Sequence, residues 1–324
     1  MRWQGATRQC AILFRMKAPL AYKASRRAAA IVAAGALGVL LLLGGCDSSD
    51  QATGAAFTPQ SAISSTTFNN AAAQTGNGAA IDTSSVSQGT VGASATSSSA
   101  LKFQVTSGQY TENFDLPGDG TPIECPLPFG NGSYTFRVMQ NTSGNNYVEL
   151  FSTTAEVSME SEFAPFLRPN VYCSYTSSSA CVAKARELVG SASNQAEAVE
   201  AICTYIVDNV SYDDDKASSL KSATGYVPNP DETLASGTGV CFDYASLGAA
   251  MLRSQGIPAK IVTGYVSPGG IYHAWIMVYI DGTWKSAQFS VDQNTWSRVD
   301  LTFAATGGGA NVGDGKNYTD RYVY

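Results

Sequence analysis

The stretch Ser236-Gly-Thr-Gly-Val-Cys241-Phe-Asp-Tyr-Ala-Ser-Leu-Gly-Ala-Ala-Met-Leu-Arg253 decides the fold. A glycine-rich start leads into strong helix formers from Tyr244 to Arg253, and Gly256-Ile-Pro258 closes the run. Cys241 is therefore predicted at a helix N-terminus. The helix dipole and the free N–H groups of the first turn stabilise a thiolate there and could receive a developing oxyanion. The alternative is a small buried thiol, which is what most free cysteines are.

His273 is the single histidine of the chain, and it stands at the start of a predicted strand, in Tyr272-His-Ala-Trp275. A cysteine at a helix start and a histidine at a strand start are the two halves of an ion-pair nucleophile, in which imidazole takes the thiol proton. A third group must fix the imidazole tautomer. One histidine and the absence of a Cys-x-x-Cys pair argue against a zinc site, and the sequence predicts no metal and no cofactor.

Five motifs occur in a fixed order along the C-terminal half: Gly239-Val-Cys241-Phe-Asp-Tyr-Ala, Leu252-Arg-Ser-Gln-Gly-Ile-Pro258, Val262-Thr-Gly-Tyr265, His273-Ala-Trp275 and Trp296-Ser-Arg-Val-Asp300-Leu-Thr-Phe. In these motifs the sequence resembles the transglutaminase-like superfamily of papain-fold cysteine enzymes. The resemblance implies an α+β fold in which a helix bearing the cysteine packs on an antiparallel sheet bearing the histidine and an aspartate. It also implies Cys241 as nucleophile, His273 as base and an aspartate as the orienting group.

Two tryptophans offer positions for that aspartate, because the family's acid follows a tryptophan by a few residues within Asp-Pro-Thr. Trp284 leads to Gln288 at this offset, and Trp296 leads to Asp300, which is followed by Leu-Thr-Phe. We assign Asp300 and interpret residues 285–295 as an inserted turn or hairpin. Gln288 and Asp292 remain the alternatives.

The neighbours of the predicted triad have simpler interpretations. Trp275 either shields the His273 pair or packs in the core, and Tyr265 is expected in the core. Asp243 is expected as a solvated acid in the first turn of the helix. The run Asp213-Asp-Asp215 lacks the spacing of an EF-hand loop, although some animal relatives of the family use calcium.

The N-terminus has the pattern of an export signal. Arg26-Arg27 precedes an apolar run from Ala28 to Leu43, and small residues follow. The ending Leu43-Gly-Gly-Cys46 resembles a bacterial lipobox, which implies lipidation of Cys46 and an anchor on the outer face of the cell membrane. An ordinary signal peptide or an uncleaved anchor is the alternative, and Met16 is an alternative start.

Removal of residues 1–45 changes the charge of the chain. These residues hold seven of the 20 Lys and Arg residues and no acid, so 13 basic residues face 26 acidic ones and the side-chain charge falls from −6 to −13. This balance argues against a nucleic-acid partner. A covalent lipid is then the more credible link to an anionic membrane.

Composition divides the remaining chain. Residues 46–100 are rich in Ser, Thr, Ala and Gly and predict a disordered tether. A β-rich region, with strands near 134–139 and 147–151, is expected over 101–175. The transglutaminase-like domain is expected over 176–324, with helices near 182–189 and 194–209 and strands near 260–266 and 273–280.

The predicted function is a cell-surface enzyme that acts on peptide or glutamine amides through a thioester, as a peptidase, an amidase or a transglutaminase. Its partner would be a peptide or protein substrate. The alternative is a non-catalytic transglutaminase-like binding module. One or two disulfides are possible among Cys125, Cys173, Cys181 and Cys203, with no connectivity deducible.

Overall fold

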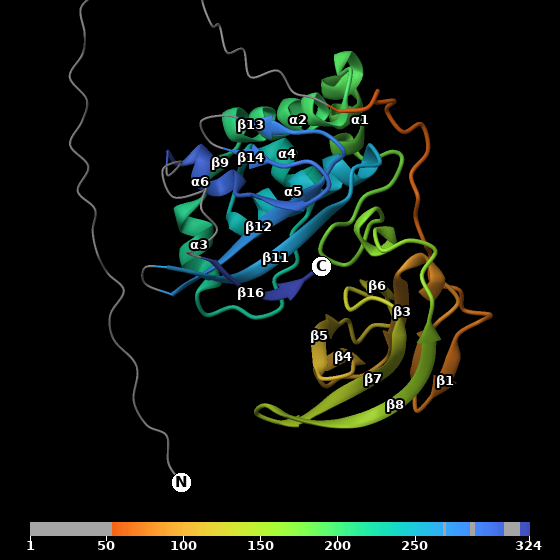
Figure 1. Ribbon diagram of the computed structural model, residues 1–324. Helices are drawn as coiled ribbons and strands as arrows, with labels where there is room; N and C mark the ends of the chain where they lie inside the picture. Colours follow the sequence, from red (N-terminus) through yellow and green to blue (C-terminus); the bar gives the residue numbers. More distant parts are fainter. Residues whose placement is uncertain (1–53, 268–269, 286–288, 308–317) are drawn as a thin grey trace, which may run out of the picture. The chain divides into compact units, whose positions relative to one another are not determined.

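Helix α5 (Cys241–Ser254) is the central element of the C-terminal part of the chain. The computed structural model describes residues 54–324 apart from 268–269, 286–288 and 308–317 (Figure 1). The signal segment and Cys46 therefore lie outside the described residues. The architecture is α+β: a β-rich part comes first, and helices packed on an antiparallel sheet follow.

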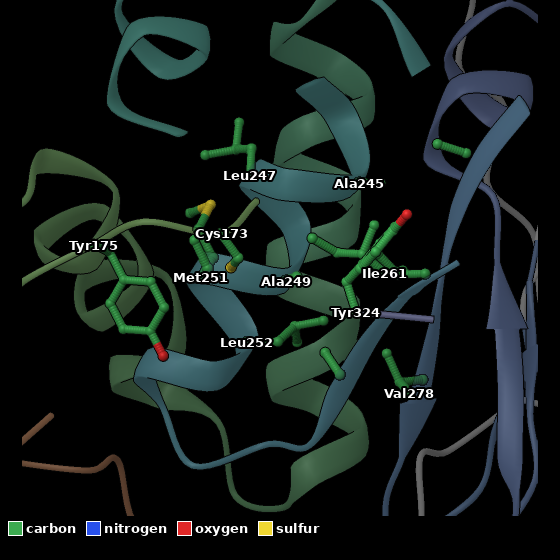
Figure 2. Packing of buried hydrophobic residues seen from close by; sticks show 14 of the residues in the cluster. Cys173, Tyr175, Ala245, Leu247, Ala249, Met251, Leu252, Ile261, Val278 and Tyr324 are labelled. Atoms are coloured by element: carbon green, nitrogen blue, oxygen red, sulfur yellow. The ribbon is translucent and has the colours of Figure 1, made fainter. Parts of the chain in front are cut away.

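The sheet beneath α5 has four antiparallel strands in the order β15-β12-β11-β16. They are β11 (Ala259–Val266), β12 (Ile271–Tyr279), β15 (Trp296–Val299) and β16 (Tyr318–Val323). Helix α5 is buried on two sides: Leu252 lies on the side of Ile261 and Val278 of the sheet, whereas Leu247 and Met251 lie on the side of Cys173 (Figure 2). This arrangement confirms the predicted helix and both predicted strands.

Other helices surround α5. They are α1 (Ala180–Leu188), α2 (Gln195–Asn209), α3 (Asp214–Leu220), α4 (Pro230–Ser236) and α6 (Leu301–Ala305). The predicted start of α2 is confirmed, because the Asn194 side chain accepts from the Glu197 amide at 2.9 Å. Short 3-10 turns lie at Val86–Gln88, Ala164–Phe166 and Val189–Ser191.

Arg253 joins the end of α5 to distant parts of the chain. The residue is 1% exposed. Its guanidinium donates to the carbonyl oxygens of Ala259 at 2.8 Å, Arg168 at 2.9 Å and Tyr324 at 2.8 Å. A buried cation is tolerated here because its hydrogen-bonding groups find fixed acceptors. Tyr324 is thereby held against helix α5.

The β-rich part contains two four-stranded sheets. One has the order β5-β4-β7-β8 and comprises β4 (Leu101–Ser107), β5 (Tyr110–Leu116), β7 (Gly132–Ser143) and β8 (Asn146–Val157). The β7–β8 hairpin confirms the predicted strand pair. The other sheet has the order β1-β2-β3-β6, with β1 (Gln74–Gly76), β2 (Ala79–Asp82), β3 (Thr90–Ala95) and β6 (Ile123–Pro126).

The predicted tether over residues 46–100 is wrong for most of its length, because three strands, β1 to β3, come from this segment. Composition misled the prediction because it counted large apolar residues, whereas the sheet buries small ones. Ala79, Ala93 and Ala95 are each at most 3% exposed. A Cβ at Gly92 would lie 2.5 Å from the Phe68 ring, so the absent side chain allows close packing.

The segment before β1 runs along the helical part of the chain. Ala56 forms a β-bridge with Asn194, and the Phe57 amide donates to the Ser193 carbonyl at 3.0 Å. Residues 56 and 57 therefore contact the start of α2. Together with strands β1 to β3, these contacts show that the folded part of the chain begins well before residue 101.

The five cysteines within the described residues are free thiols, and disulfides among them are not formed. Four are buried: Cys125, Cys173, Cys181 and Cys203. Burial raises the pKa of the Cys173 thiol to about 11, so this group packs as a small apolar residue. In the described part of the chain, every helix is too short or too polar to cross a membrane.

Candidate active site

Cys241 is the first residue of α5, as the sequence predicted. A two-residue parallel ladder fixes the chain just before it, where β10 (Thr238–Gly239) pairs with β9 (Ser211–Tyr212). Unlike the four buried cysteines, Cys241 is partly exposed. It opens onto a cleft of about 560 Å³ that His273 also lines. A thiol at a helix start, open to a cleft, is placed for nucleophilic attack.

His273 lies on β12 and is buried, with 6% of its surface exposed. Its Nε2 is 2.8 Å from Oδ2 of Asp300, which is itself fully buried. Because Nε2 binds the carboxylate, Nδ1 is the ring nitrogen left for the thiol. The structure therefore brings together Cys241, His273 and Asp300, the three residues predicted as a triad.

The electrostatics of His273 fit a base held between a thiol and a carboxylate. Burial alone lowers the pKa of the imidazole, but hydrogen bonds with Asp300 and with Cys241 outweigh burial and raise this pKa to about 10. The raised value means that the imidazolium form is stabilised by its two partners. Such an environment suits His273 to accept a proton.

Asp300 is held from three directions. Its Oδ1 accepts from the Phe303 amide at 3.0 Å and so caps α6, while its Oδ2 also accepts from the Tyr318 hydroxyl at 2.9 Å. The departure from the family's Asp-Pro-Thr therefore leaves the acid firmly placed. Of the alternatives, Asp292 pairs with Lys285 at 3.9 Å instead, and Gln288 lies outside the described residues. The inserted hairpin is present as β13 (Trp284–Lys285) and β14 (Ser290–Val291).

Aromatic rings cover the imidazole. The Phe303 ring stacks on His273 with centroids 4.6 Å apart, and the Trp275 ring lies 6.3 Å away. Trp275 is 1% exposed and packs in the core as well, so both interpretations of this residue are correct. The sequence analysis did not single out Tyr318, because its contact with Asp300 depends on β16, a strand that follows much later in the chain.

Two predictions about neighbouring residues are wrong. Asp243 is fully buried and accepts from the Val240 amide, the Tyr226 hydroxyl and the Lys216 ammonium. A solvated acid was expected because the first turn of a helix usually faces water, but partners from α3 and the loop after it cover this one. Tyr265, expected in the core, is 39% exposed.

The cleft combines aromatic walls with few charges. Six aromatic residues line it: Tyr172, Tyr212, Tyr226, Phe242, Tyr272 and Tyr324. Lys221 also lines it, and so does Asp115, which comes from β5 of the β-rich part and pairs with Lys102. A larger hollow of about 820 Å³, between residues 61–67 and 169–177, is lined mainly by hydroxyl and apolar side chains. Among the described residues, no cluster of three or more His, Cys, Asp or Glu side chains is placed to hold a metal ion.

Comparison with known families agrees with this geometry. Residues 182–301 match the model of the transglutaminase-like superfamily, a range that contains Cys241, His273 and Asp300. This part of the chain is a transglutaminase-like domain. The α+β fold and the general kind of enzyme expected from the sequence, a cysteine enzyme, agree with this match.

Two relatives have sequences similar to part of the chain. An uncharacterised protein of Mycobacterium leprae is 31% identical over 117 residues, which is 31% of this chain and 38% of the relative. A protein of Methanocaldococcus jannaschii is 30% identical over 106 residues, which is 30% of this chain and 29% of the relative. The chain thus spans less than two fifths of the length of either relative.

Three solved structures are similar to the chain. A candidate cysteine protease from Cytophaga hutchinsonii is 18% identical, with a TM-score of 0.33, over 72% of this chain and 86% of that one. A TGase is 19% identical, with a TM-score of 0.29, over 38% and 29%. A candidate protease from Parabacteroides distasonis is 18% identical, with a TM-score of 0.28, over 66% and 45%.

Proposed function

We propose that this chain is an acyl-transfer enzyme that attacks peptide or glutamine side-chain amides with the thiolate of Cys241. The observation that carries the proposal is the hydrogen bond of His273 to the Asp300 carboxylate at 2.8 Å, made in an open cleft that Cys241 also lines. Asp300 holds the imidazole in one orientation, so that its other nitrogen faces the nucleophile.

The chemistry follows from these positions. His273 takes the Cys241 proton, and the sulfur forms a bond to the amide carbonyl carbon while the carbonyl electrons move onto oxygen. The N–H groups at the start of α5 are placed to stabilise this oxyanion. The imidazolium then protonates the departing nitrogen, the C–N bond breaks, and a thioester remains on Cys241.

The second half of the reaction separates two activities. If water attacks the thioester, with His273 accepting its proton, the enzyme is a peptidase or amidase. If an amine attacks, the enzyme is a transglutaminase that releases ammonia from glutamine. Product masses after incubation with casein and a primary-amine probe distinguish the two, because hydrolysis cleaves or deamidates whereas transfer adds the mass of the amine.

The experiment that tests the site is alkylation of the intact protein by iodoacetamide at neutral pH. We expect Cys241 to react first, because the other described thiols are buried. Labelling of structural thiols with Cys241 unmodified would refute the nucleophile. A Cys241→Ala protein that keeps every activity of the wild type would favour a non-catalytic binding module instead.

We also propose that the protein is exported and anchored through a lipid on Cys46. The support is sequence alone: the basic segment, the apolar run and Leu43-Gly-Gly-Cys46. Incorporation of labelled palmitate in a bacterial host, lost in Cys46→Ser, tests the anchor. An unlabelled wild-type protein would refute it.

A further inference from the structure

Asp243 is a buried carboxylate two residues after the nucleophile, and the reaction described above does not use it. It is fully buried, yet each of its oxygens is occupied. Oδ2 accepts from the Val240 amide at 2.8 Å and from Lys216 Nζ at 2.7 Å, and Oδ1 accepts from the Tyr226 hydroxyl. A buried charge with this many partners is costly to leave unpaired, so it fixes the groups around it.

The partners of Asp243 come from one wall of the cleft. Lys216 belongs to α3, and Tyr226 belongs to the segment that follows this helix. Ala217, Leu220, Lys221, Gly225 and Tyr226 all line the cleft that holds Cys241 and His273. We name α3 and residues 221–226 the cleft wall. Asp243 is therefore the point at which the cleft wall is tied to the catalytic helix.

Asp243 is closely packed against the turn that precedes Cys241. A Cβ at Gly239 would lie 2.7 Å from Cβ of Asp243, so the turn before Cys241 has room only for glycine at that position. On the wall side, Lys216 Nζ also lies 4.9 Å from the centre of the Tyr226 ring, in a cation–π contact. Burial and the hydrogen bond to Asp243 together raise the pKa of Tyr226 to about 12, which keeps this phenol a hydrogen-bond donor.

We propose that Asp243 is a positioning residue that locks the cleft wall onto the helix carrying Cys241, so that substrate-binding surface and nucleophile move as one unit. The inference rests on the proposed function, because it concerns the same cleft. It differs from that proposal in assigning no chemistry to Asp243. Loss of the lock should disturb the binding of an extended substrate and leave the intrinsic reactivity of the thiol nearly unchanged.

The test uses Lys216→Met and Tyr226→Phe in the full chain, with two matched controls. Lys184 is the control for Lys216, since it also pairs with an acid at 2.7 Å, on Glu187, and also lies 5.5 Å from a tyrosine ring. That ring, Tyr205, provides the control Tyr205→Phe. Two reagents report on Cys241: iodoacetamide, which is too small to need the wall, and a benzyloxycarbonyl dipeptide fluoromethyl ketone, which must lie along the cleft.

For Lys216→Met we expect the ketone to react about tenfold more slowly while iodoacetamide changes by less than about twofold, since displaced binding groups impair orientation rather than the thiol. Hydrogen exchange should accelerate in residues 214–226 and not in α1. Lys216→Arg keeps the positive charge, so its rate of reaction with the ketone and its hydrogen exchange should equal those of the wild type. Tyr226→Phe should show the same pattern to a smaller degree.

The proposal would be overturned if Lys216→Met and Lys184→Met had equal rates of reaction with the ketone and equal hydrogen exchange in residues 214–226. It would also be overturned if Lys216→Met exchanged faster in these residues but reacted with the ketone at the wild-type rate. A parallel fall with both reagents would also overturn it, since that outcome indicates damage to the nucleophile. Failure of the proposed function looks different: wild-type Cys241 would react with neither reagent faster than a buried thiol, while hydrogen exchange would still report on the lock.

Discussion

Two acids near the candidate nucleophile, Asp243 and Asp300, differ in their hydrogen bonding from two acids of the β-rich part, Glu112 and Glu124. In the transglutaminase-like part, Asp243 and Asp300 each have three hydrogen-bond or ion-pair partners, and these partners occupy both oxygens of each carboxylate. In the β-rich part, Glu112 and Glu124 each have one oxygen without a hydrogen-bond partner. Burial raises the pKa of Glu112 to about 8 and, with the nearby Asp82 charge, that of Glu124 to about 7.

The difference shows where this fold needs charge and where it only tolerates acids. Near the nucleophile, a fixed negative charge orients the imidazole or holds the cleft wall, so donors are arranged around it. Between the strands, a carboxyl with too few donors is kept neutral at the cost of sensitivity to pH. The experiments on Asp300 and Tyr318 test whether activity depends on the fully hydrogen-bonded acid, and the experiment on Glu112 tests whether the pH dependence of stability arises from an acid with too few donors. The experiment on Arg253 tests a buried cation in the same way.

Asp300→Asn should have the largest effect. An amide in place of the carboxylate keeps the size but reverses one hydrogen bond and removes the charge that supports the imidazolium, so we expect kcat/KM to fall by about 10³. Activity on the substrate found by mass spectrometry measures the effect, and Asp292→Asn is the matched control. Equal activity of the two variants would mean that Asp300 does not orient His273.

Arg253→Met should have the largest effect on stability. The substitution removes a buried donor from the carbonyl oxygens of Ala259, Arg168 and Tyr324, of which the last keeps the Ile261 amide at 2.8 Å, so we expect a loss of about 3 kcal/mol in the free energy of unfolding. Urea denaturation measures it. The control is Arg137→Met, because Arg137 is partly exposed and makes only a pair with Glu149 at 3.3 Å and a hydrogen bond to Gln104 Oε1 at 3.3 Å; a surface pair of this kind is worth about 1 kcal/mol or less. If both variants lose the same stability, the buried guanidinium is not a structural anchor.

Glu112→Gln should remove a pH dependence. The carboxyl has a folded-state pKa of about 8, above its ordinary value of 4.5, so the folded protein binds a proton that the unfolded chain releases. Stability from this group is fully present below pH 4.5 and is lost as the pH rises toward 8. Denaturant midpoints between pH 5 and 8 should fall less in Glu112→Gln than in the wild type. A Glu149→Gln control that flattens the profile equally would contradict this origin.

Tyr318→Phe should have the smallest effect. It removes one of two donors to Oδ2 of Asp300 and leaves the His273 contact in place, so we expect kcat/KM to fall about fivefold, the equivalent of one hydrogen bond. Tyr279→Phe, on the strand that carries His273, is the control. A fall as large as that of Asp300→Asn would show that the phenol, rather than the imidazole, is the main partner of the acid.

Local patterns in the sequence predicted the catalytic part well. Short-range signals placed Cys241 at a glycine-rich helix start and His273 near the start of a strand after a Pro/Gly loop, whereas Asp300 was assigned from the resemblance to the transglutaminase-like superfamily. The contacts of Asp243 and Tyr318 could not be predicted in this way, because their partners come from separate loops and strands. Nor could strands β1 to β3, since small residues become a core only when another sheet covers them.

The bridge between Ala56 and Asn194 has a consequence for a lipid-anchored protein. Only nine residues lie between Cys46 and Ala56, and the ten steps from one Cα to the next extend at most about 35 Å. With a lipid on Cys46, Ala56 could lie no farther than about 35 Å from the lipid anchor, and the folded part of the chain would stay close to the bilayer. Polypeptides attached to the same membrane would have a high effective concentration at the cleft, whereas the effective concentration of freely diffusing polypeptides would be unchanged.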